Sequence, residues 1–233
     1  AHLHGGDMTK GAYDDACRPA ITKLSHLHFP ALPAHAARIA AMGEEPWRIH
    51  CVGALALDAI ARFRPPSRES LARELNFDPA EPLHVVIFHP ETLASMPVSA
   101  QIAELVAVLN GLRGWVMILG PNADVGRDTI ADAWREGINH RPKTLLLPSM
   151  PQKQFWGCLA HAAVLIGNSS AGIIEAASFG LPVVNIGDRQ KGRVHDANVL
   201  DAPLHRSAIA RAISLALDPA FRASLAGLTN PYG

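Results

Sequence analysis

The segment from Gly167 to Glu175 carries the clearest chemical signal in the sequence. It reads Gly-Asn-Ser-Ser-Ala-Gly-Ile-Ile-Glu, directly follows an apolar run, and opens a pattern of helical period. A strand that ends in small residues and starts a helix gathers backbone N–H groups and the positive end of the helix dipole, which suits a phosphate. The segment matches neither a Walker nor a GxGxxG pattern, so the cofactors bound by those motifs are not indicated.

Four side-chain positions in this segment fit a nucleotide. Ser169 and Ser170 add hydroxyl donors, and the lack of a side chain at Gly172 would let a ligand approach the backbone. Glu175, one helical turn further on, could accept the two hydroxyls of a ribose. The structural alternative is a serine N-cap followed by a first-turn charge, and the spacing alone leaves both open.

A second segment, Gly187 to Arg193, follows the apolar run Val183–Ile186 and places three cations in a glycine-punctuated loop. The cations are Arg189, Lys191 and Arg193. Beside the start of a helix they would suit a diphosphate, whereas alone they would indicate a solvated loop.

Short apolar runs and amphipathic segments alternate along the chain, which is typical of βαβ units around a parallel sheet. We predict strands at 27–29, 49–52, 85–88, 115–119, 144–147, 164–166 and 183–186, and helices at 13–25, 33–42, 100–112, 128–135, 152–161, 171–179 and 207–217. Because the strands of the later block are almost wholly apolar, helices should cover both faces of their sheet. The stretch Arg62–Ser67, with Pro65-Pro66, is the predicted linker, so we expect domains at 1–62 and 63–233.

Composition excludes several classes of protein. Lys plus Arg equals Asp plus Glu at 21 each, so no excess charge indicates nucleic acid or an acidic membrane surface. No apolar run approaches the ~20 residues of a membrane span. The three cysteines, Cys17, Cys51 and Cys158, share no CxxC spacing, so neither a disulfide framework nor a zinc site is indicated, and a cytoplasmic location suits them.

The string from Gly167 to Arg193 resembles the signature of the UDP-N-acetylglucosamine 2-epimerase family, particularly its hydrolysing branch. Further similar motifs occur in family order over essentially the whole chain: HLHGGD at 2–7, DD with Arg at 14–18, AITKLSH at 20–26, FHPET at 88–92, PNAD at 121–124 and NPYG at 230–233. The resemblance implies two doubly wound Rossmann-like domains in a GT-B-like arrangement. It also implies that about the first hundred residues of the N-terminal domain, and a short C-terminal tail, are missing.

The resemblance also implies roles for individual residues. Ser169 and Ser170 would bind phosphate oxygens, Glu175 would hold the ribose, and Arg189 would lie near the nucleotide. Two further residues are expected beside the nucleotide, Asn122 in one loop and Met150 at the uracil. His89, at the end of a strand, would contact the diphosphate and stabilise the charge of departing UDP. The alternative for His89 is a strand-end histidine with a structural partner.

The implied reaction is elimination of UDP to 2-acetamidoglucal followed by addition of water, which releases N-acetylmannosamine. It needs a base at C2 of the sugar. Asp14 and Asp15 project about 100° apart at the start of a helix, and Asp14 aligns with the family carboxylate. His4 stands where many relatives carry Glu and could itself act as a base, and Asp7 is the other candidate. Pro19, where the family usually has His, should disturb the first helix.

Several functions stay open on the sequence alone. A hydrolysing epimerase for a bacillosamine-type UDP-sugar is the nearest alternative, and a non-hydrolysing epimerase fits the motifs less well. A non-catalytic UDP-sugar-binding remnant and a GT-B glycosyltransferase are the alternatives from other classes. We expect no cofactor and no metal ion, a UDP-sugar as ligand, and a homo-oligomer.

Overall fold

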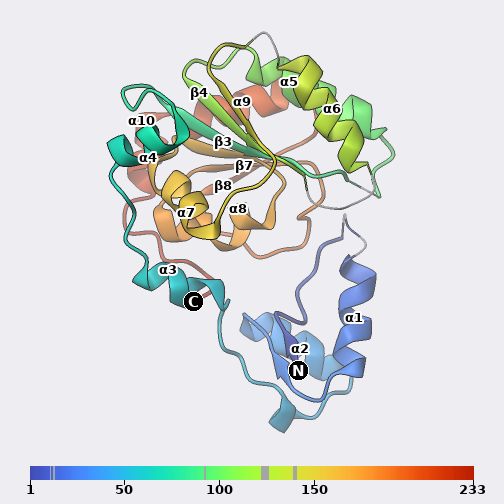
Figure 1. Cartoon of the computed structure of the whole chain (residues 1–233). Helices are drawn as coiled ribbons and strands as arrows, with labels where there is room; N and C mark the ends of the chain where they lie inside the picture. The colour runs from blue at the N-terminus through green and yellow to red at the C-terminus, as the bar shows by residue number, and fades with distance from the viewer. Residues whose placement is uncertain (11, 13, 92, 122–125, 139–140) are drawn as a thin grey trace.

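A six-stranded parallel sheet forms the larger part of the protein, and a smaller part at the N-terminus contains a two-stranded parallel sheet (Figure 1). The computed structural model describes residues 1–10, 12, 14–91, 93–121, 126–138 and 141–233.

The strands of the small sheet are β1 (His2–Leu3) and β2 (His28–Phe29). Those of the large sheet are β3 (Leu83–Ile87), β4 (Trp115–Leu119), β5 (Thr144–Leu147), β6 (Val164–Gly167), β7 (Val183–Ile186) and β8 (Val199–Ala202). The helices of the first 75 residues are α1 (Asp14–Leu24), α2 (Pro33–Ala41), η1 (Pro46–Arg48), α3 (Ala56–Arg62) and α4 (Arg68–Leu75). The later helices are α5 (Val98–Leu109), α6 (Arg127–Gly137), α7 (Gln152–His161), α8 (Ser170–Ile174), η2 (Ala176–Phe179), α9 (Arg206–Ala216) and α10 (Pro219–Ser224).

The large sheet has the strand order β5-β4-β3-β6-β7-β8. The chain builds outward from β3 through β4 to β5, and then crosses back to place β6 on the other side of β3. In a doubly wound sheet, ligands bind beyond the carboxyl ends of the strands where this reversal occurs. Because Ile87 pairs with Gly167 at the carboxyl ends of β3 and β6, the switch point falls at the residues that follow these two.

Both faces of the large sheet are buried, which explains its apolar strands. Alternate residues of β3 point to opposite faces of the sheet. Val85 and Ile87 join the cluster beneath α4, α7 and α8, whereas Val86, and Phe88 directly after the strand, join the cluster beneath α5, α6 and α9. Every residue of β3, β6 and β7 is buried. The sheet is therefore a rigid support for the loops at its carboxyl edge.

The C-terminal residues return to the smaller part of the molecule. Tyr232 is completely buried, and its carbonyl oxygen accepts a hydrogen bond from the backbone N–H of Ala54 at 2.8 Å. Asn230 donates to the carbonyl oxygen of Ile174 at 2.8 Å. The C-terminal turn thus joins the N-terminal segment to the helix that follows β6.

The predicted strands of the large sheet and its main helices are confirmed, and so is the α/β doubly wound fold class. The strand predicted at 49–52 is wrong in extent, because only Ile49 forms a bridge, to His28, before the chain turns at Gly53 with φ of 78°. Strand β8 and helices α3, α4 and α10 were not predicted from the sequence. The domain division at residues 62 and 63 stays a prediction.

Candidate functional site

Gly167 and Asn168 hold the carboxyl ends of β3 and β6 together. Gly167 has φ of 137°, and a Cβ atom there would lie 1.9 Å from the carbonyl oxygen of Ile87, so only glycine fits. The buried side chain of Asn168 accepts a hydrogen bond from the backbone N–H of His89 at 2.8 Å and donates to the carbonyl oxygen of His89 at 2.9 Å. The backbone of His89 is therefore fixed at the switch point.

The paired serines follow directly. Ser169 is the N-cap of α8, and its hydroxyl oxygen accepts from the backbone N–H of Ala171 at 3.3 Å. Both Ser169 and Ser170 are half-buried at the carboxyl edge of the sheet. The capping role considered as an alternative for Ser169 is present, and it does not prevent the hydroxyl from donating to a phosphate oxygen, because a hydroxyl both accepts and donates.

Gly172 has a packing role that was not predicted from the sequence. A Cβ atom on Gly172 would lie 2.8 Å from Cγ1 of Val183, and its N–H donates to the carbonyl oxygen of Ser169 at 3.1 Å. The missing side chain therefore lets α8 pack against β7. A role for Gly172 in nucleotide binding stays a prediction.

Glu175 is the half-buried C-cap residue of α8. Met150, also half-buried, packs against the core cluster that contains Ile173 of the same helix. Oε1 of Glu175 accepts a hydrogen bond from Nε1 of Trp156 at 2.8 Å. Burial raises the pKa of the Glu175 carboxyl, and the bond from Trp156 opposes that shift. A carboxylate in such surroundings gains from further hydrogen-bond donors such as sugar hydroxyls. The predicted site residue Asn122 lies outside the described residues.

Glu91 holds the loop from Gly187 to Arg193 against the switch point. The carboxylate of Glu91 accepts a hydrogen bond from the backbone N–H of Arg189 at 3.1 Å. A Cβ atom on Gly187, whose φ is 75°, would lie 2.0 Å from Oε1 of Glu91. Burial raises the pKa of this carboxyl. Glu91 belongs to the HPET motif, but no pattern in the sequence indicated this role.

The three cations of the loop do not act together, contrary to the sequence-based expectation. The buried Arg189 donates to the carbonyl oxygen of Asn168 at 3.3 Å. Lys191 pairs with Asp188 at 3.1 Å on the surface, and Arg193 pairs with Asp7 at 3.0 Å. Arg189 is thus the loop cation that contacts the switch point directly. A pocket of about 340 Å³ lies beside this loop and the ends of β7 and β8.

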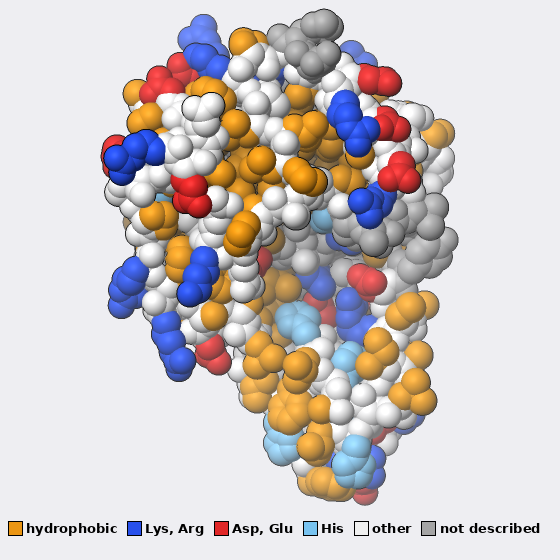
Figure 2. Space-filling model, in the orientation of Figure 1, with side chains coloured by type: hydrophobic (Ala, Val, Ile, Leu, Met, Phe, Trp, Pro, Cys, Tyr) orange, Lys and Arg blue, Asp and Glu red, His pale blue; other side chains and the backbone are white. Residues whose placement is uncertain are grey.

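The carboxylate of Asp7 is the centre of a buried polar cluster between the two parts of the molecule. Its oxygens lie 3.3 Å from Nε2 of His4, 3.3 Å from Nε2 of His35 and 3.0 Å from Nη2 of Arg193. The rings of His4 and Tyr232 stack with centroids 5.9 Å apart. In Figure 2, histidine side chains gather in the hollow where the smaller part meets the larger one.

Electrostatics make Asp7 a weak base. Burial by itself would raise the pKa of this carboxyl, but the hydrogen bond from His4 and the charges of Arg193 and His35 outweigh it and lower the pKa to about 2. Burial lowers the pKa of His35 to about 4, although Asp7 opposes the shift. A fully buried carboxylate that already holds three partners is suited to orient them, and it is poorly suited to take a proton.

At the start of α1, Asp14 is exposed, whereas Asp15 accepts a hydrogen bond from the backbone N–H of Thr9 at 2.7 Å. Arg18 donates to the carbonyl oxygen of Asp7 at 2.9 Å and so ties α1 to the cluster. The expected disturbance by Pro19 is wrong, because α1 continues through it to Leu24. Of the two adjacent aspartates, the structure uses Asp15 to hold a turn and leaves the side chain of Asp14 in solvent.

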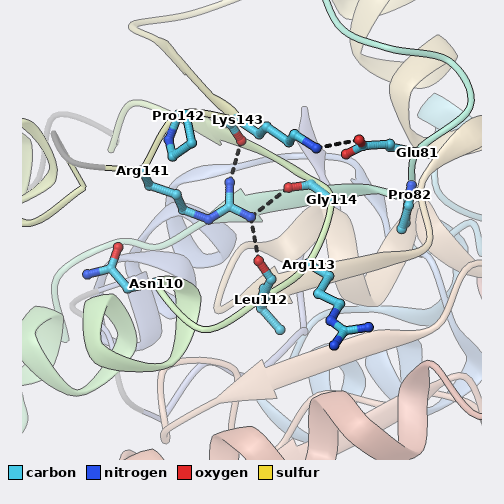
Figure 3. A pocket seen from close by; sticks show the side chains of 9 residues that line it. All are labelled: Glu81, Pro82, Asn110, Leu112, Arg113, Gly114, Arg141, Pro142 and Lys143. Atoms are coloured by element: carbon cyan, nitrogen blue, oxygen red, sulfur yellow. Dashed lines mark hydrogen bonds and ion pairs between the residues drawn. The ribbon is translucent and has the colours of Figure 1, made fainter.

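A pocket of about 480 Å³ lies at the opposite, amino ends of β3, β4 and β5 (Figure 3). The guanidinium of Arg141 donates hydrogen bonds to the backbone carbonyl oxygens of Leu112 and Gly114 at 2.7 and 2.6 Å. Lys143 pairs with Glu81. Because the side chains of Arg141 and Lys143 bind the protein's own acceptors, these two cations stabilise the loops at the amino edge of the sheet.

No helix among the described residues is long and apolar enough to cross a bilayer. Within the same residues, no three His, Cys, Asp or Glu side chains are grouped so that they could hold a metal ion.

Comparison with known proteins assigns the family. The model of the UDP-N-acetylglucosamine 2-epimerase family matches residues 1–233. The chain belongs to this family. It is 34% identical over 234 residues to the polysialic acid biosynthesis protein P7 of Escherichia coli, covering 99% of this chain and 59% of that protein. It is 36% identical over 217 residues to the UDP-N,N'-diacetylbacillosamine 2-epimerase (hydrolyzing) of Legionella pneumophila, covering 93% and 57%.

The fold agrees with this family. The structure of the UDP-GlcNAc 2-epimerase from Neisseria meningitidis bound to UDP-GlcNAc matches with a TM-score of 0.80 at 14% identity, over 100% of this chain and 65% of that one. The GT-B-like fold expected from the sequence is therefore confirmed. This epimerase-family chain spans less than three fifths of the length of the two curated relatives.

Proposed function

We propose that this chain binds a UDP-sugar across the carboxyl ends of β3 and β6 and serves the hydrolysing 2-epimerisation of UDP-N-acetylglucosamine. The observation that carries the proposal is the convergence on Asn168 at the switch point. Its side chain bonds the backbone of His89, its carbonyl oxygen accepts from Arg189, and Ser169 follows it directly. The family assignment and the solved relative with bound UDP-GlcNAc support the choice of ligand.

In the proposed binding mode the diphosphate lies over Ser169 and Ser170, with His89 and Arg189 beside it. Glu175 accepts hydroxyls of the ribose, and Met150 and Asn122 lie by the base. Hydroxyl and cationic donors at the end of a sheet stabilise charge that develops on a departing phosphate. His89 is well suited to this, because its backbone is fixed on both sides by Asn168.

The proposed reaction starts with removal of the C2 proton by Asp14. The electron pair forms a C1–C2 double bond while the C1–O bond breaks, and UDP leaves with the negative charge. Water then adds across the double bond of the 2-acetamidoglucal: its hydroxyl bonds to C1 and a proton reaches C2 from the opposite face. His4 is the proposed second acid–base group, because its imidazole is partly exposed and lies beside the Asp7 carboxylate, whereas Asp7 orients His4 and Arg193.

A second candidate is the hydrolysing 2-epimerisation of UDP-N,N'-diacetylbacillosamine, the activity after which the Legionella relative is named. The two reactions share every step at C1 and C2. They differ in the sugar, so a direct competition between the two substrates separates them. We further propose that the protein is cytoplasmic and forms a homo-oligomer. Light scattering after size-exclusion chromatography tests the oligomeric state.

The decisive experiment combines UDP titration with NMR of the products formed from UDP-N-acetylglucosamine in D2O. Free N-acetylmannosamine with deuterium at C2 is the expected product. Epimerised sugar that still carries UDP would indicate the non-hydrolysing reaction, and transfer to an acceptor would indicate a glycosyltransferase. Binding of UDP without turnover would indicate a non-catalytic UDP-sugar-binding protein. Absence of UDP binding would overturn the proposal.

Asp14→Asn tests the catalytic assignment. We expect turnover to fall by at least about 100-fold, as is usual when a general base is lost, with UDP affinity unchanged. Asp128→Asn is the matched control, because Asp128 is also an exposed aspartate in the first turn of a helix, α6, and is not part of the site. Equal turnover in the two variants would remove Asp14 from the mechanism.

A further inference from the structure

Trp156 and Glu175 form a polar contact on the core side of the proposed nucleotide site. Nε1 of Trp156 donates to Oε1 of Glu175 at 2.8 Å. Among the residues that the structure describes, no hydrogen bond to Oε2 of Glu175 is found. The bond therefore fixes the rotation of the carboxylate and leaves its other oxygen as the one that can accept from a ligand.

The indole itself is held in place. Trp156 lies on α7 with 2% of its surface exposed, inside the cluster that covers one face of the sheet. Its ring packs edge-to-face against Phe63, with centroids 5.6 Å apart and planes at 64°. Because the donor is held in place, the Glu175 side chain is already restricted before a ligand binds, and binding costs less conformational entropy.

We propose that Trp156 is a positioning residue that orients the Glu175 carboxylate for a vicinal diol, and so sets the selectivity of the site for a ribonucleotide over a deoxyribonucleotide. This inference rests on the proposed function, in which Glu175 meets the ribose. A carboxylate accepts two hydroxyl protons well only when it is ionised and correctly turned. Burial opposes ionisation of Glu175 and the Trp156 bond favours it, so the indole N–H supports both conditions.

The alternative is that the bond only satisfies a buried indole N–H. In that case loss of the donor would change stability but leave ligand selectivity unaltered. The two cases therefore differ in a quantity that a purely structural role does not change, namely the ratio of affinities for UDP and 2',3'-dideoxyuridine 5'-diphosphate.

The test is calorimetric titration of both nucleotides into the wild type, Trp156→Phe and Trp134→Phe. Trp156→Phe removes the N–H and keeps an aromatic ring; we expect UDP affinity to fall roughly five- to tenfold, the effect of about one hydrogen bond, and dideoxy-UDP affinity to stay unchanged. Trp134→Phe is the matched control, because Trp134 is completely buried in the other core cluster. It should keep the wild-type ratio.

Each outcome decides a different point. If the wild type binds no UDP, the proposed function fails. If the wild type prefers UDP to its dideoxy analogue and Trp156→Phe keeps that preference, only the role of Trp156 is overturned. Should Trp156→Phe not fold, Phe63→Leu serves instead, since it keeps the N–H but removes the ring that holds the indole; a reduced preference for UDP supports the inference, and an unchanged one refutes it.

Discussion

Replacement of Asp7 by Asn tests whether the buried cluster joins the two parts of the protein through charge. The side chain of Asp7 is completely buried, and its ion-pair partner Arg193 has a side chain that is only 7% exposed. Asn keeps the size of the side chain and can still accept from the backbone N–H of Met8, 2.8 Å away in the wild type. It leaves the guanidinium without its anion.

The magnitude follows from two considerations. The pKa of Asp7 falls from 3.8 to about 2 on folding, which corresponds to about 2 kcal/mol of stability at neutral pH. Removal of one member of a buried ion pair commonly costs about 3–5 kcal/mol, because the other charge stays buried. We therefore expect Asp7→Asn to lower the free energy of unfolding by about 3 kcal/mol at neutral pH.

The pH dependence has a defined sign. Because the folded pKa lies below the unfolded one, the contribution of Asp7 is fully present above the unfolded value of 3.8 and is lost as pH falls towards about 2. Urea denaturation followed by tryptophan fluorescence should show the variant and the wild type converging by about 2 kcal/mol over that interval. Asp132→Asn, which breaks an exposed ion pair with Arg135, should change stability by less than about 1 kcal/mol. A difference at neutral pH as small as that of the control, or one that persists unchanged in acid, would refute the reasoning.

Three further variants, with one control variant, test other parts of the structure. Folding lowers the pKa of His35 from 6.5 to about 4. The wild type should therefore lose about 3 kcal/mol of stability as pH falls from 6.5 to about 4. Urea denaturation of His35→Gln should not show this loss. Gly167→Ala should lower the free energy of unfolding by more than about 3 kcal/mol, measured by thermal unfolding, because φ is left-handed and the added Cβ would clash with the backbone. Gly180→Ala is the control. Its φ is 58° but no atom lies within 4 Å of the added Cβ, so the loss should be about 1 kcal/mol. Gly172→Ala should lower the free energy of unfolding by about 1–3 kcal/mol because of overpacking against Val183. If packing is the sole role of this glycine, UDP titration shows unchanged affinity, whereas a selective loss of affinity supports the direct role predicted from the sequence.

The large sheet was predictable because its strands are buried on both faces. Runs such as Trp115–Leu119 and Val183–Ile186 have no polar face that must reach water, so an apolar run between helical patterns identifies them. Strand β8 lies at the edge and reads Val-Leu-Asp-Ala, with Asp201 exposed. A four-residue edge strand with one charge carries too little periodicity to be recognised.

The position of the candidate site was predictable, whereas its internal contacts were not. The motif residues fall after strands, and parallel strands bring their carboxyl ends to one edge, so Ser169 and His89 were expected near each other. The partners of buried charges depend on packing between elements that are distant in sequence. His35 on α2 reaches Asp7, 28 residues earlier, and no pattern within either segment indicates the contact.

The loop from Gly187 to Arg193 links the two halves of the proposed mechanism. At one end Arg189 contacts the switch point through Asn168, and at the other Arg193 contacts Asp7, the partner of His4. The Glu91 carboxylate fixes the loop backbone at Arg189. A bound diphosphate that moved Arg189 would therefore also shift Arg193, four residues later, and with it the Asp7 cluster. The residues proposed for nucleotide binding and for proton transfer lie in motifs that are distant in the sequence, and this loop contacts both groups. Substitutions in the loop should therefore alter UDP affinity and turnover together, even where the side chain replaced contacts neither the nucleotide nor the sugar.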